Sequence, residues 1–165
     1  MARNPASGPV IISVLDRLID NDPKRREEVP LTRAQSVHQL KVALRRDIEW
    51  LLNTRRTIDP APDSARETVR SVFHYGFVDI SSRSALSGDD QSDLAREMES
   101  AISMFERRLK RARVRMEPVG DNKSNLRFVI EGMLCMNPAP EPVRFDAVLE
   151  LSKGEYDVKG EDGAR

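Results

Sequence analysis

The chain has 165 residues, of which 33% are charged and 5% aromatic, and its 27 Lys and Arg residues balance 27 Asp and Glu residues. This length suits one domain with a real core, and a net charge of zero argues against whole-protein attraction to nucleic acid or a membrane surface. The single cysteine, Cys135, cannot form an internal disulfide, so we expect a reducing, cytoplasmic compartment. The apolar segment 9–15 is too short to span a membrane, and we expect no membrane insertion.

The N-terminal part of the chain predicts little regular structure. We expect a flexible tail over 1–12, a single domain over 13–159 and a second flexible tail over 160–165. A short helix over 13–20 would present four apolar side chains, Val14, Leu15, Leu18 and Ile19. The charged segment 24–33 contains Pro30 and is interpreted as a connector.

The strongest periodic signal is a predicted amphipathic helix over 36–56. Its apolar stripe consists of Val37, Leu40, Leu44, Ile48, Leu51 and Leu52. Ser36 and Gln39 are spaced as a capping box, and Arg55 and Arg56 fall in the last turn, where positive charge suits the helix dipole. Trp50 lies off the stripe. It is either covered by another segment, which we favour and for which the N-terminal helix is available, or kept for a partner.

Between the two long helices the sequence predicts helical turns over 67–73, a break at which Gly76 is a candidate for positive φ, and a polar loop over 81–90. A second amphipathic helix is then predicted over 91–112. Its stripe consists of Leu94, Met98, Ala101, Ile102, Phe105 and Leu109. Acidic residues precede it and basic residues end it, in the order that the helix dipole favours.

From residue 113 onward the hydrophobic period changes from about 3.6 to 2, as in strands. Strands are predicted over 113–119, 126–136 and 143–151, with a turn over 120–125 and a last short strand over 156–159 after Lys153 and Gly154. Cys135 is expected to be a small, buried or half-buried strand residue. The fold class is therefore α+β, with amphipathic helices packed on one face of a small, mostly antiparallel sheet.

Four stretches in order resemble the lysozyme-like baseplate wedge family, the small wedge subunits of contractile phage tails and of the type VI secretion baseplate. They are 15–18 with Asp20, 45–56, 75–79 and 105–109, and they lie within 13–116. The opening Leu-Asp-Arg-Leu and the ending Leu-Asn-Thr-Arg-Arg are more similar to TssE, the secretion-system branch, than to the phage members. The family typically has Glu-Pro-Arg where this chain has Glu106, Arg107 and Arg108, so the middle position departs from the pattern.

The resemblance implies a structural subunit without enzymatic activity or cofactor, located in the bacterial cytoplasm as part of a membrane-docked baseplate. Its implied partners are the other wedge proteins, TssF, TssG and TssK, and the contractile sheath formed by TssB and TssC. A sheet edge near the C-terminus would be able to accept strands from a sheath subunit. We expect eight residues to bind partners: Glu106, Arg107, Arg108, Arg45, Arg46, Trp50, Arg55 and Arg56.

Two alternative functions compete with this interpretation. A peptidoglycan hydrolase would need two carboxyl groups across a cleft, and Glu49 and Glu106 are the candidates, but neighbouring arginines disfavour a general acid. For Glu49 the ordinary alternative is an ion pair with Arg45. A nucleic-acid-binding module would rest on the basic segment 107–115, which is equally interpreted as a protein-docking surface or a solvated face. No metal or phosphate-binding motif is present in the sequence.

Overall fold

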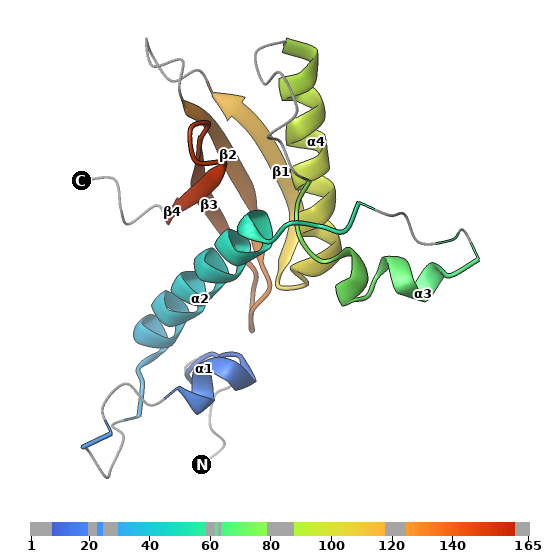
Figure 1. The fold of residues 1–165 in the computed structure, drawn as a ribbon. Coiled ribbons are helices and arrows are strands. Elements are labelled where there is room, and N and C mark those ends of the chain that lie inside the picture. The colour runs from blue at the N-terminus through green and yellow to red at the C-terminus, as the bar shows by residue number, and fades with distance from the viewer. Residues whose placement is uncertain are drawn as a thin grey trace.

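The computed structural model describes residues 8–19, 23–24, 30–58, 62, 64–78, 88–117 and 125–160. The helical elements are α1 (Val14–Leu18), α2 (Arg33–Asn53), α3 (Arg66–Val69), the 3-10 turn η1 (Val72–His74) and α4 (Gly88–Phe105). The strands β1 (Leu109–Glu117), β2 (Asn125–Leu134), β3 (Glu141–Glu150) and β4 (Glu155–Gly160) follow. The order of helices first and strands last confirms the α+β prediction (Figure 1).

The four strands form one antiparallel sheet in the order β1-β2-β3-β4. The last turn lies where the sequence predicted it, because Gly154 has a φ of 68° between β3 and β4. Most of the predicted turn over 120–125 lies outside the described residues.

Helix α2 begins earlier and ends earlier than the sequence predicted. The N-cap is Thr32, whose hydroxyl accepts from the Gln35 amide while the Gln35 side chain accepts from the Thr32 amide, so the capping box at Ser36 and Gln39 was wrong. Ser36 is instead buried, and its hydroxyl accepts from the Val10 amide at 2.9 Å. Arg55 lies beyond the helix, in a parallel bridge with Phe77.

The predicted end of the second long helix at 112 was also wrong. Helix α4 stops at Phe105, and Leu109 opens β1 opposite Leu134. The Glu106 carboxylate accepts the Arg108 backbone N–H at 3.0 Å, and such a local side-chain bond competes with helix continuation. Leu109 is buried in the strand, as it would have been in the predicted helix, and only 2% of it is exposed.

The core lies between one face of the sheet and the helices α2 and α4. Its centre is made of fully buried side chains from all three parts, among them Leu44, Ile48, Met98, Ile102, Phe128, Ile130 and Leu149. The other face of the sheet carries ion pairs between neighbouring strands, such as Arg115 with Glu131 and Arg127 with Asp146. This arrangement confirms helices on one face of the sheet.

Both outer edges of the sheet are partly closed by helix side chains. On β4, the Asn53 side chain bonds both the amide and the carbonyl of Tyr156 at 2.8 Å, and Arg45 donates to the Val158 carbonyl at 2.8 Å. On β1, the Val114 amide donates to Glu99 of α4 at 3.1 Å. Helix side chains therefore satisfy backbone groups that an edge strand otherwise leaves open.

Two further predictions concern single residues. Gly76 does adopt a positive φ, of 116°, and its neighbour Phe77 joins the end of α2 through two backbone bonds, to Thr54 and from Arg56. Cys135, predicted to be buried or half-buried, is exposed, because β2 ends one residue before it at Leu134.

Candidate partner-docking site

Glu106 and Arg108 lie in the turn that joins α4 to β1, not on a helix. The Arg108 side chain folds back onto Glu106: its Nε donates to Glu106 Oε1 at 2.8 Å and its Nη2 contacts Oε2 at 2.5 Å. Only 8% of Glu106 is exposed, and burial of a carboxylate is tolerable because the guanidinium and a backbone N–H satisfy it. Because the predicted helix over 91–112 ends at Phe105, the two residues are not helical as that prediction required, and they form one forked pair.

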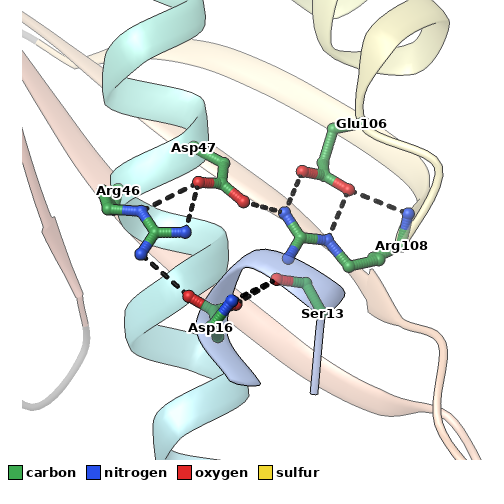
Figure 2. Close-up of polar contacts among 6 residues, drawn as sticks. All are labelled: Ser13, Asp16, Arg46, Asp47, Glu106 and Arg108. Atoms are coloured by element: carbon green, nitrogen blue, oxygen red, sulfur yellow. Dashed lines mark hydrogen bonds and ion pairs between the residues drawn. The ribbon is translucent and has the colours of Figure 1, made fainter. Parts of the chain in front are cut away.

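This pair is the first part of a longer chain of alternating charges (Figure 2). Arg108 Nη2 also contacts Asp47 Oδ2 of α2 at 2.5 Å. Asp47 Oδ1 accepts two bonds from Arg46, at 2.8 and 3.0 Å, and Arg46 Nη1 reaches Asp16 of α1 at 2.8 Å. Asp16 in turn bonds Ser13, the N-cap of α1. We call Glu106, Arg108, Asp47, Arg46 and Asp16 the ion-pair chain; it ties α1 and α2 to the α4–β1 turn.

The charges of this chain stabilise one another, and the pKa shifts show it. Hydrogen bonding to Glu106, together with the charges of Glu106 and Asp47, raises the pKa of Arg108 despite its partial burial. Burial alone would raise the pKa of Asp16, but its bonds to Ser13 and Arg46 outweigh burial and lower that pKa. Arg108 and Asp16 are therefore held in their charged forms.

Trp50 lies one helical turn beyond Arg46 and remains about half exposed, at 52%. The Arg46 guanidinium carbon lies 4.9 Å from the centre of the Trp50 ring, a cation–π arrangement. The favoured prediction, that another segment covers Trp50, was wrong: among the described residues, Arg46 is the neighbour that covers one face. α1 is held near α2 by the bond of Asp16 to Arg46, while its own apolar side chains stay exposed.

Beside the ion-pair chain is a surface hollow of about 370 Å³. It is lined by Asp47, Leu51, Tyr75, Phe105, Glu106, Arg107 and Arg108. Tyr75 packs edge-to-face on Phe105 with ring centres 5.3 Å apart. Burial, and then the negative charges of Asp47 and Glu106, raise the pKa of Tyr75. The hollow combines an aromatic wall with charged groups, a composition found at protein interfaces.

The remaining predicted site residues are not members of the ion-pair chain. Arg107 is exposed in the α4–β1 turn. Arg45 points to β4 and makes the predicted ion pair with Glu49, at 2.9 Å. Arg55 and Arg56 are exposed beyond the end of α2, where Arg55 forms the bridge with Phe77 and the Arg56 amide donates to the Phe77 carbonyl. The structure thus gathers Glu106, Arg108, Arg46 and Trp50, and separates Arg45, Arg55 and Arg56 from them.

Sequence reasoning missed Asp47 and Asp16 as members of the site. Both residues could have been singled out from the sequence, because Asp16 lies in the Leu-Asp-Arg-Leu stretch and Asp47 in the 45–56 stretch that carried the resemblance. Asp16 pairs with Arg46 of another stretch, and Asp47 contacts Arg108 of a third stretch as well as its neighbour Arg46. What was lacking was the knowledge that the motifs meet in space.

The arrangement favours recognition over hydrolysis. Both oxygens of Glu106 accept hydrogen bonds from Arg108, and Glu49 is paired with Arg45. A general acid has to present a proton to a substrate, whereas these carboxylates are engaged as acceptors. Within the described residues no cluster of metal-ligating side chains occurs. No helix in the described part of the chain is both long and apolar enough to cross a membrane.

Comparison with known proteins identifies the family of this chain. Residues 38–139 match the family model described as baseplate wedge protein gp25, and this range covers more than half of the chain. Comparisons with curated proteins and with solved structures gave no match. The matched range includes Arg46, Asp47, Glu106 and Arg108 of the ion-pair chain, while α1 precedes it. The chain therefore belongs to the baseplate wedge protein gp25 family, structural components of contractile-tail and secretion baseplates.

Proposed function

We propose that this chain is TssE, the wedge subunit of a type VI secretion baseplate, and that it acts as a single non-enzymatic domain over 13–159 in the bacterial cytoplasm. The support is the Leu-Asp-Arg-Leu and Leu-Asn-Thr-Arg-Arg stretches, which are more similar to TssE than to phage members. The proposed partners are TssF, TssG and TssK in the wedge, and TssB and TssC in the first sheath ring.

The observation that carries the proposal is the ion-pair chain at the α4–β1 turn. It joins α1, α2 and that turn, which come from three of the four stretches that resemble the family. It also borders the hollow at Tyr75 and Phe105. A partly buried network of charges next to aromatic groups fixes the orientation of a docked partner, because misplaced charges are costly when water is excluded. We propose that wedge partners bind here, with Trp50 and Arg107 as outward contacts.

Sheath contact is proposed at a different place, the ledge of β3 beyond the end of β4. The last β3–β4 pair is Phe145 with Gly160, so Glu141–Arg144 of β3 have no β4 partner among the described residues. Next to this ledge is a groove of about 310 Å³ lined in part by Lys41, Val42 and Val143. An extended strand from a sheath subunit would pair with the ledge and place side chains in the groove. Edge positions along Tyr156–Val158 are less suited, since Asn53 and Arg45 already bond them.

The wedge proposal is tested with the double variant Glu106→Gln with Arg108→Gln in pull-downs with purified TssF and TssG. Removing a partly desolvated charged pair should weaken binding at least tenfold, since one such contact is worth about 2–5 kcal/mol. The matched control is Asp93→Asn with Arg96→Gln, an exposed pair on α4 that should leave binding unchanged.

Circular dichroism and urea melts of both double variants separate the outcomes. Loss of binding by a folded variant supports docking. Full binding by a folded Glu106→Gln with Arg108→Gln variant contradicts it. If that variant unfolds, the single change Trp50→Ala, at an exposed position, takes its place, and unchanged binding by Trp50→Ala then counts against the site.

A further inference from the structure

Near the start of β1, one residue other than glycine has an unusual backbone conformation, and it is Arg111. Arg111 has a φ of 55°, the left-handed region that L residues other than glycine seldom adopt. The strand pairing is irregular here: Lys110 pairs with Met133 and Arg113 with Glu131, so two residues of β1 oppose Gly132 alone. This is a β-bulge whose first residue is left-handed, a position at which glycine is the usual choice.

The bulge changes which side chains face outward. Leu109 and Ala112 are buried, and Lys110 and Arg111 between them are both exposed, which regular alternation would not allow. Gly132 contributes no side chain opposite them. A Cβ there would lie 2.7 Å from the Leu109 side chain and 3.1 Å from the Lys110 carbonyl. The bulge therefore directs two adjacent cations to solvent.

These cations have no acidic residue at the positions opposite them in β2. Opposite Lys110 is Met133, and opposite Arg111 is Gly132, whereas Arg115 further along pairs with Glu131 at 2.7 Å. Arg107 in the preceding turn is exposed as well. Within the part of the chain that the structure describes, Arg107, Lys110 and Arg111 have no ion pair, and we call these three residues the basic patch.

We propose that the basic patch is a docking surface for an acidic, extended protein segment, distinct from the proposed sheath contact and adjoining the proposed wedge contact at Arg107. Strained residues persist where the surrounding fold imposes them, and they cluster at sites of function. Here a glycine would relieve the strain, yet the position carries a long cationic side chain. The patch lies along an edge strand, so an acidic segment can place several carboxylates against it in sequence.

An acidic protein segment fits better than a nucleic acid. Binding to single strands uses aromatic side chains for base stacking, and the nearby Phe105 and Tyr75 pack on each other instead. A duplex would need a longer track of cations, and the next arginines along β1 are already paired, Arg113 with Glu99 and Arg115 with Glu131.

The test uses a fluorescein-labelled peptide of alternating glutamate and glycine as probe, with binding followed by anisotropy at low and high salt. The variant Arg111→Gly should raise the urea midpoint, since it relieves the left-handed strain, and should weaken peptide binding about fivefold, the most that one exposed ion pair contributes. Arg111→Lys keeps the charge and should bind as the parent protein does. Arg66→Gln, an exposed position on α3, is the control and should change neither quantity.

A merely structural role of Arg111 would not produce a gain in stability together with a loss of peptide affinity in Arg111→Gly. If Arg111→Gly gains stability and keeps full peptide affinity, the proposal is overturned. It is also overturned if Arg111→Lys binds as weakly as Arg111→Gly, or if a labelled DNA duplex binds more tightly than the peptide at the same salt concentration. Weaker binding by Arg111→Gly, with recovery in Arg111→Lys, supports it.

Discussion

At the scale of single residues, backbone conformation is as decisive as side-chain chemistry in this protein. Gly76 allows the chain to pass close to the end of α2, so that Phe77 can bond Thr54 and Arg56. Gly154 allows the turn between β3 and β4. Both have positive φ, but their surroundings differ, and this difference gives a matched comparison.

The variant Gly76→Ala should be more destabilised than Gly154→Ala. A Cβ at residue 76 would lie 2.4 Å from the Thr54 carbonyl oxygen, whereas one at residue 154 meets nothing within 4 Å. Gly154→Ala should cost about 1–2 kcal/mol, the ordinary cost of a left-handed alanine. Gly76→Ala adds a backbone clash and should cost more than about 2 kcal/mol. Urea melts measure both values, and equal losses would contradict the assigned contact with Thr54.

At the scale of elements, α1 is held by charge more than by apolar packing. Its side chains Val14 and Leu18 are 66% and 76% exposed, while Asp16 bonds Arg46 at 2.8 Å. Val10, which precedes it, is the partly buried apolar anchor of this segment. Docking of α1 should therefore depend on the ionisation of Asp16.

Acid should release α1 from α2. The folded protein lowers the pKa of Asp16 below its ordinary value of 3.8, against the effect of burial, through bonds to Ser13 and Arg46. A carboxyl group whose pKa is lower in the folded state stabilises that state above the ordinary value, and this stabilisation is lost as pH falls through the folded value. The docked α1 should thus persist at pH 5 and detach below about pH 3.8.

The single tryptophan reports this release, because Arg46 lies over the Trp50 ring and also bonds Asp16. Trp50 fluorescence should change below pH 3.8 before the far-ultraviolet circular dichroism of the rest of the chain is lost. Asp16→Asn should show the released spectrum already at pH 6. An Asp16→Asn spectrum equal to that of the parent protein at pH 6 would show that α1 docks without this ion pair.

At the scale of the whole molecule, the two faces of the sheet differ in polarity. The face toward α2 and α4 is apolar, and the other face carries ion pairs among exposed or half-exposed side chains. Burial of apolar area stabilises a fold far more than exposed ion pairs do. Stability should therefore reside in the apolar layer, while the charged face keeps an uncovered sheet solvated.

Two alanine variants compare these layers directly. Leu44→Ala, at a side chain that is fully buried, should cost about 2–5 kcal/mol. Arg144→Ala removes contacts of 3.5 to 3.8 Å with Glu117, Glu131 and Asp146, but the Arg144 side chain is 38% exposed. It should cost less than about 1 kcal/mol. Urea melts at low and high salt test this order, and a larger loss in Arg144→Ala would show that the charged face contributes more than its exposure implies.

Local patterns in the sequence were sufficient for the helices, the strands and the class of fold. The stripe of Leu40, Leu44 and Ile48 and the alternation along β3 are determined by which side chains must leave water, so the period alone predicts them. The boundaries of the helices depended on competing local hydrogen bonds, which the hydrophobic period does not reveal. The N-cap of α2 is Thr32 and not Ser36, and the Glu106 carboxylate accepts the Arg108 amide just after the end of α4.

Tertiary structure alone decided what the polar motif residues do. The chain separates Asp16, Asp47 and Arg108 widely, and they meet only because α1, α2 and the α4–β1 turn pack at one place. Likewise, Arg111 is one of several arginines in a basic run until the bulge opposite Gly132 turns it outward. Apolar burial follows from each residue's own chemistry, and the sequence determines it. A charged side chain takes its role from its partner, and only the folded chain supplies that partner.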